Sequence, residues 1–227
     1  MTDTAATAGS AAEADSTTGA TARLEQDREH VAAADEAHGH VTNTGISNEK
    51  LAMWVFLGSE CLLFGGLIST YLLYKQNNQA GGPLPRDLYD IPFTSISSFV
   101  LLMSSLTMVL AVAAIGRGDE AKLRTWLLTT AGLGSIFIAG QVYEFQTFVK
   151  EGMGFTTNSA SSAFFTLTGF HGVHVSVGIV MLVSATVMSM RGRIPPARAE
   201  AVEIVGLYWH FVDVVWILIF TVVYLIE

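Results

Sequence analysis

Charged residues are scarce in this 227-residue chain: Asp, Glu, Lys and Arg make up 14% of it, whereas a soluble domain carries about 25%. The single cysteine, Cys61, excludes a disulfide within the chain and any site built from several thiolates. Twelve basic residues against 20 acidic ones exclude a surface basic enough to bind nucleic acid. With 51% hydrophobic residues, the composition indicates a membrane protein.

The charges that are present are placed unevenly. Residues 1–49 hold nine of the 20 acidic residues and are rich in Ala, Thr, Gly and Ser, which predicts a disordered polar tail. Within it, residues 24–36 could form a polar surface helix. His38 and His40 could bind a metal, but a flexible tail does not hold ligands in place, so we interpret them as part of a solvated linker. No signal-peptide core precedes the first long apolar run, so no cleaved leader is expected.

Long apolar runs dominate the rest of the chain. Five of them reach the length of about 20 residues that a helix needs to cross the hydrocarbon core of a bilayer. Short polar loops separate them, so sequence neighbours should pack antiparallel. The predicted fold is therefore all-α, a five-helix transmembrane bundle formed by residues 50–227. The predicted spans are residues 51–74, 93–115, 123–149, 161–190 and 201–226.

The basic residues predict how the bundle lies in the membrane. With the N-terminus in the cytoplasm, nine Lys and Arg residues fall on the cytoplasmic side and three on the outside. Since Lys and Arg favour the cytoplasmic side, the N-terminus is expected inside and the C-terminus outside. Six of the inner residues are predicted to hold anionic lipid head groups: Arg117, Lys122, Arg124, Arg191, Arg193 and Arg198.

One carboxylate, Glu60, interrupts the first apolar run. It lies nine residues into the span, which at 1.5 Å per residue places it roughly 13–14 Å deep, close to the bilayer midplane. An ionised acid there costs several kcal/mol, so Glu60 is expected to be either protonated or partnered. Both a functional role and a structural hydrogen bond to a neighbouring helix stay open.

Four of the five spans carry ionisable residues at overlapping depths, which predicts a buried polar layer. Besides Glu60, the layer comprises Glu144, His171, His174, His210 and Asp213. His171 and His174 share one helix face. They could be metal or haem ligands, but a haem between two helices takes a histidine from each, so neutral imidazoles bonding across helices are favoured. His210 and Asp213 are interpreted as a contact within one helix.

Small and aromatic residues complete the pattern of the spans. Trp54, Trp126 and Tyr224 lie near span ends and are expected to be interfacial anchors. Close helix packing is expected where small residues recur: at Gly65, Gly66 and Ser69, and at Gly169, Gly172 and Gly178.

These residues alone do not name a reaction. A proton-coupled transporter with Glu60, His171 and Asp213 as a relay is one hypothesis, although the sequence shows no inverted repeat. A haem b anchor with His210 as a ligand is another.

Four motifs resemble subunit III of the haem-copper respiratory oxidases in its bacterial five-helix form. They are "GSECLLFGG" at 58–66, "GQVYEF" at 140–145, "TGFHGVHVSVG" at 168–178 and "YWHFVDVVWILIFTVVYL" at 208–225. The resemblance implies an accessory subunit without a catalytic or metal site in a bacterial-type cell membrane. Its partners would be subunit I, with the haems and copper in partner subunits, subunit II, and a small subunit IV where one is present. It also implies bound phospholipid and support of proton uptake during reduction of O2 to water.

The resemblance also assigns residues. Glu60 aligns with the family's carbodiimide-reactive intramembrane glutamate, and the histidine motifs at 171–174 and 210–213 are structural in that family. The mitochondrial-type subunit has two additional helices before the first span found here. The donor is expected to be cytochrome c, with a quinol as the alternative.

Overall fold

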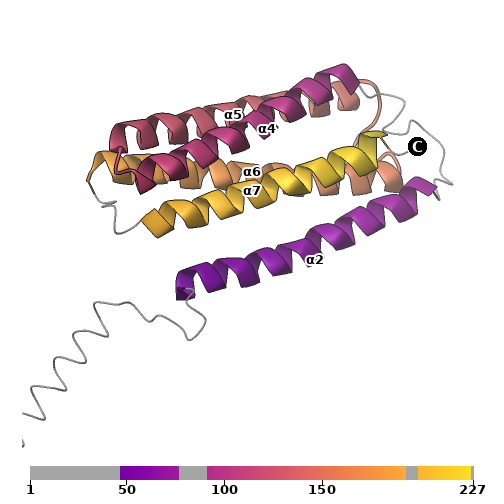
Figure 1. Cartoon of the computed structure of the whole chain (residues 1–227). Coiled ribbons are helices and arrows are strands. Elements are labelled where there is room, and N and C mark those ends of the chain that lie inside the picture. The colour runs from indigo at the N-terminus through magenta and orange to yellow at the C-terminus, as the bar shows by residue number, and fades with distance from the viewer. Residues whose placement is uncertain (1–46, 77–90, 193–198, 226–227) are drawn as a thin grey trace, which may run out of the picture. The chain divides into compact units, whose positions relative to one another are not determined.

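The computed structural model describes residues 47–76, 91–192 and 199–225. Residues 1–46 of the predicted tail, with its histidines, as well as Arg193 and Arg198, therefore lie outside the described residues. Five α-helices and one terminal π-helical turn make up the described secondary structure (Figure 1). They are α2 (Asn48–Gln76), α4 (Ile91–Gly116), α5 (Glu120–Lys150), α6 (Ser159–Met190), α7 (Ala199–Phe220) and η2 (Thr221–Leu225).

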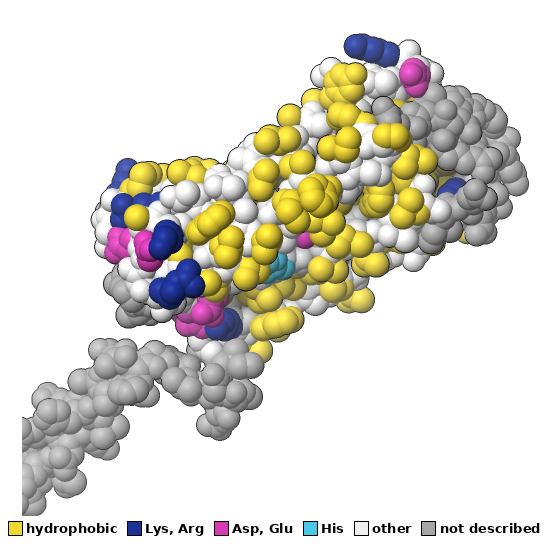
Figure 2. Space-filling view, turned by 45° about the horizontal axis from the view of Figure 1, so that its top comes forward, with side chains coloured by type: hydrophobic (Ala, Val, Ile, Leu, Met, Phe, Trp, Pro, Cys, Tyr) yellow, Lys and Arg dark blue, Asp and Glu magenta, His cyan; other side chains and the backbone are white. Residues whose placement is uncertain are grey.

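The five predicted spans are confirmed. Each α-helix is long and apolar enough to cross a membrane, and the helix ends lie within three residues of the predicted ends, apart from the C-terminal turn. No strand occurs among the residues that the structure describes. Figure 2 shows one face of the molecule, on which hydrophobic side chains cover most of the length of the helices while Lys, Arg, Asp and Glu gather mainly at the ends. This is the surface expected where lipid takes the place of water.

Four of the helices close into a ring. α4 packs on α5, α5 on α6, α6 on α7, and α7 returns to α4. These elements belong to one compact unit, residues 53–227. α2 turns a single face to this ring, because its buried apolar residues Leu57, Phe64 and Tyr71 recur every seven residues. Only 11% of the apolar window of α2 is buried, against 33–44% in the other spans, so α2 depends on a few side-chain contacts.

Trp209 of α7 fills the centre of the ring. It is 1% exposed, and its Nε1 donates to Ser104 Oγ at 2.9 Å. A Cβ on Gly134 of α5 would lie 2.5 Å from Trp209 Cη2, and one on Gly178 of α6 would lie 2.8 Å from Cε3 and Cζ3. The indole therefore lies between two glycines, and only glycine leaves the space that it occupies.

The predicted role of small residues in close helix packing is confirmed within the described chain at two of these positions. Gly178 and Gly172 each face a close side chain from another helix. A Cβ on Gly65, Gly66 or Gly169 would meet no atom within 4 Å among the described residues. These three glycines do not serve packing within the part of the chain that the structure describes.

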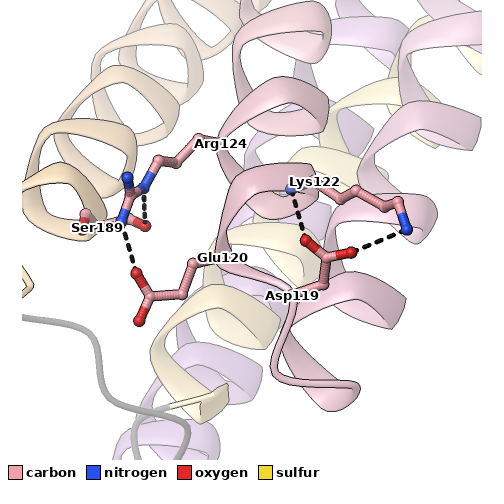
Figure 3. A network of polar contacts seen from close by, with 5 residues as sticks. All are labelled: Asp119, Glu120, Lys122, Arg124 and Ser189. Carbon is pink, nitrogen blue, oxygen red and sulfur yellow. Dashed lines mark hydrogen bonds and ion pairs between the residues drawn. The ribbon is translucent and has the colours of Figure 1, made fainter.

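A polar network fastens α5 to α6 at one end of the ring (Figure 3). Arg124 donates from Nε to Ser189 Oγ and from Nη2 to the Ser189 carbonyl, both at 3.0 Å, and pairs with Glu120 at 2.5 Å. Since Ser189 lies in the last turn of α6, Arg124 satisfies a carbonyl that the helix end leaves open.

Asp119 begins α5 at the same end (Figure 3). Its side chain accepts from the Lys122 backbone N–H at 3.1 Å and pairs with Lys122 Nζ at 2.8 Å. The side-chain and backbone hydrogen bonds from Lys122 lower the pKa of Asp119 below its ordinary value of 3.8. This cap is therefore fully formed above that value and is lost as the pH falls through the lowered pKa.

Candidate functional site

A carboxyl–imidazole contact joins α2 to α6 inside the membrane-spanning region. Glu60 Oε2 of α2 lies 3.1 Å from His174 Nε2 of α6, and the two side chains are 13% and 15% exposed. Glu60 was expected to be either protonated or partnered, and the structure shows that it has a partner, His174. The contact thus joins a glutamate and a histidine that lie 114 positions apart in the sequence.

The second ring nitrogen of His174 determines which protons this contact can hold. His174 Nδ1 lies 2.7 Å from the Phe170 carbonyl oxygen. A carbonyl only accepts, so Nδ1 carries a proton and donates it. Nε2 then either accepts from a protonated Glu60 or, in an imidazolium, donates to the carboxylate. In both states the Glu60–His174 contact contains one proton, which this geometry allows to lie on either group.

Aromatic side chains surround the pair. The ring of Phe64 meets His174 edge-on with centroids 5.1 Å apart. Phe56 stacks on Tyr208 at 6.4 Å, and the Tyr208 hydroxyl donates to the His174 carbonyl at 3.0 Å. These rings come from α2 and α7, so they keep water away from two sides of the contact. In such surroundings a hydrogen bond is stronger than in water.

His171 lies one turn before His174 but has a different environment. It is fully buried, stacks on Trp216 with centroids 4.9 Å apart, and meets the edge of Phe137 at 5.9 Å. Neither of its ring nitrogens has a hydrogen-bond partner among the described residues. The prediction that both histidines bond across helices is therefore right for His174 and wrong for His171. The reason is helix rotation, which places His174 beside Glu60 and leaves His171 among aromatic rings, including Phe64 of α2.

A second polar group links α4 to α7. Ser105 Oγ donates to Asp213 Oδ2 at 2.7 Å, and His210 Nδ1 lies 3.3 Å from the same hydroxyl. The predicted contact between His210 and Asp213 within one helix is therefore corrected: Ser105 from the neighbouring helix connects them. A serine inside an apolar run carries no signal that would have identified it from the sequence.

Glu144 forms a third group near the other end of α5. Its Oε1 accepts from Thr94 at 2.7 Å and from the Tyr224 hydroxyl at 3.2 Å. Tyr224 is 8% exposed, so its expected role as an interfacial anchor is wrong. The π-helical turn at 221–225 contains this tyrosine. The predicted polar layer thus divides into three separate hydrogen-bonded groups, with His171 in none of them.

Metal coordination has no support from this geometry. Among residues 47–76, 91–192 and 199–225, no group of three His, Cys, Asp or Glu side chains could hold a metal ion. The arrangement is suited to holding a proton at Glu60 and His174 and to fastening α2 to the ring.

Comparison with known proteins identifies the family. A family model described as cytochrome c oxidase subunit III matches residues 26–227, nearly the whole chain. The chain belongs to this family. Its members are accessory subunits of terminal oxidases.

Relatives in the subunit III family carry two kinds of name. "Cytochrome c oxidase subunit 3" of Bacillus sp. (strain PS3) is 40% identical over 178 residues, which cover 78% of this chain and 86% of the relative. "Probable quinol oxidase subunit 3" of Staphylococcus saprophyticus is 41% identical, with 78% and 88% covered. "Quinol oxidase subunit 3" of Bacillus subtilis is 39% identical, with 77% and 85% covered.

Proposed function

We propose that this chain is the accessory subunit III of a cytochrome c oxidase that reduces O2 to water, and that it stabilises the catalytic subunit and supports proton uptake. The match to the family over residues 26–227 carries the proposal. The haems and copper belong to partner subunits, with subunits I and II, and a small subunit IV where one is present, as the partners. A quinol is the second candidate donor, because relatives named quinol oxidase are as similar as the one named cytochrome c oxidase.

Purification with partner subunits tests this proposal. The chain is isolated in mild detergent, and an optical difference spectrum of the eluate is recorded. Haem and copper should arrive with larger chains and leave when those chains are stripped away. The haem types and the oxidation of added cytochrome c or quinol then distinguish the two donors. Haem that stays with the isolated chain would contradict an accessory role and revive the haem-anchor hypothesis.

Within this function, the Glu60–His174 pair is proposed to hold a proton and to keep α2 attached, without taking part in electron transfer. The proposal is supported by the single proton that the contact contains and by the position of the pair between two spans. A carboxyl group in apolar surroundings is also the kind of group that a hydrophobic carbodiimide reaches, as the family resemblance implies for Glu60.

We expect Glu60→Gln to abolish carbodiimide labelling of this chain and to leave the haem spectra of the complex unchanged. The amide keeps the size of the carboxyl group but cannot form the carbodiimide adduct. Glu144→Gln is the matched control, since it changes another intramembrane acid and should leave labelling intact. Peptide mass spectrometry measures the adduct. Loss of a haem band in Glu60→Gln would contradict the assignment.

The basic residues near one end of the ring are proposed to contact anionic lipid head groups on the cytoplasmic side. Arg117, Lys122 and Arg191 are exposed there, whereas Arg124 is engaged with Ser189 and Glu120. The N-terminus is proposed to be cytoplasmic and the C-terminus outside, as the Lys and Arg asymmetry predicts. Unchanged phospholipid content after Arg117→Gln with Arg191→Gln would count against the first proposal. A fused reporter after Glu227 that is active only in the cytoplasm would refute the second.

A further inference from the structure

A groove runs between α5 and α6 on the outside of the ring. Its volume is about 490 Å3, and both helices line it, mainly with apolar side chains such as Val142, Phe145, Val173 and Val177. Val173 and Val177 are 62% and 48% exposed. The groove is therefore open to the surroundings of the chain rather than sealed within it. It is separate from the Glu60–His174 pair, which lies between α6 and α2.

Two polar side chains, Gln141 of α5 and Ser176 of α6, line this groove, and the Ser176 hydroxyl donates to the Gly172 carbonyl of its own helix at 2.8 Å. Gln141 is the one that reaches across to the other helix. It is 7% exposed, and its Nε2 donates to the Thr168 carbonyl of α6 at 2.8 Å. Gly172 makes room for it, because a Cβ there would lie 2.9 Å from Gln141 Oε1. No hydrogen bond to Oε1 is formed within the described residues. An amide oxygen left without a donor in hydrocarbon is unfavourable, so this oxygen calls for a donor from outside the chain.

Gly169 provides an independent observation. It lines the same groove one turn from Gly172, but a Cβ on it would meet no described atom within 4 Å. Glycine inside a helix is less stable than alanine, and packing within the described chain does not require it at this position. The space beside Gly169 is suited to the close approach of another backbone, as in packed membrane helices.

We propose that the α5–α6 groove receives a transmembrane helix of another oxidase subunit, which places a hydrogen-bond donor against Gln141 Oε1. The inference rests on the proposed function for the existence of that subunit, and it adds the face on which the subunit packs. A lipid acyl chain would fill the groove but would leave the amide oxygen unpaired. A helix can supply a hydroxyl, amide or indole donor, and Gly169 allows its backbone to come close.

The test compares two identical substitutions in the assembled complex, Gly169→Leu and Gly132→Leu. Both glycines lie within long spans and have no described atom near a Cβ, but only Gly169 lines the groove. Leucine at 169 should occupy the space of the incoming helix and reduce the partner subunits recovered per copy of this chain about fivefold or more. Leucine at 132 should leave that ratio unchanged.

Photo-crosslinking supplies the second measurement without altering the glycines. A benzophenone amino acid at Val173 should form an adduct with another membrane subunit. Equal partner recovery for the two leucine variants, or adducts with phospholipid alone at Val173, would overturn the proposed face. If the unsubstituted chain recovers no partner at all, the proposed function fails instead. Circular dichroism should show the same helix content for Gly169→Leu as for the parent chain. If the helix content differs, the variant is misfolded, and the crosslink at Val173 then tests the proposal.

Discussion

His174→Phe is expected to destabilise the protein by about 2–4 kcal/mol, one of the two largest effects that we anticipate. The substitution keeps an aromatic ring between Phe64 and Glu60 but removes the only polar partner that the carboxyl group has among the described residues. A buried acid that loses its partner retains the full desolvation penalty. Because α2 has few other contacts with the ring, its detachment should accompany the loss of stability. Thermal unfolding of the purified complex in detergent measures the change.

His171→Phe is the matched control for this prediction. The same change is made three residues earlier, where neither ring nitrogen has a described hydrogen-bond partner. Removing polar atoms that lack partners should cost less than about 1 kcal/mol or increase stability. A Glu60→Leu, His174→Phe double variant should recover much of the loss of the single change, as a double-mutant cycle would show. Equal costs at positions 171 and 174 would mean that the Glu60–His174 bond contributes little.

Gly178→Ala is expected to destabilise the ring by about 1–3 kcal/mol, the cost of overpacking a filled core. The added methyl would lie 2.8 Å from two ring atoms of Trp209. The indole is held on its other side by Gly134 and through its Nε1 by Ser104, so it has little freedom to move away. Chemical unfolding followed by tryptophan fluorescence measures the loss.

The same change at an open glycine separates overpacking from a general effect of alanine. Gly132→Ala adds a methyl group that meets nothing within 4 Å, so the higher helix propensity of alanine should stabilise α5 by up to about 1 kcal/mol. The two substitutions are thus expected to have opposite signs. Trp209→Phe, combined with Gly178→Ala, replaces the indole with a smaller ring. If this double variant is no more stable than Gly178→Ala alone, a clash with the indole does not cause the loss of stability.

The fold was predictable because its main determinant is local. A span must carry about 20 apolar residues to cross the hydrocarbon, and each of the five runs met that requirement with polar residues at its ends. The expected depth of Glu60 rests on the same reasoning, since helical rise converts sequence position into distance, and it stays a prediction. Membership in the subunit III family likewise rests on motifs that lie within single spans.

The partners of the polar residues were not predictable in this way. Helical periodicity shows that His171 and His174 share a face, but it does not give the rotation of α6 against α2. That rotation places His174 against Glu60 and puts His171 among aromatic rings. Ser105 joins His210 to Asp213 for the same reason, because α4 and α7 pack together although 108 positions separate Ser105 from Asp213.

The glycines show the same division most clearly. The sequence by itself determined five apolar helices, an acid inside the first of them and small residues at recurring positions in two of the spans. Only the tertiary structure decided that Gly178 accommodates Trp209, that Gly172 accommodates Gln141, and that Gly169 accommodates no described atom. The physical reason is that a glycine leaves space beside the backbone, and the sequence does not show which side chain fills that space. The packing of whole helices determines which side chain lies there.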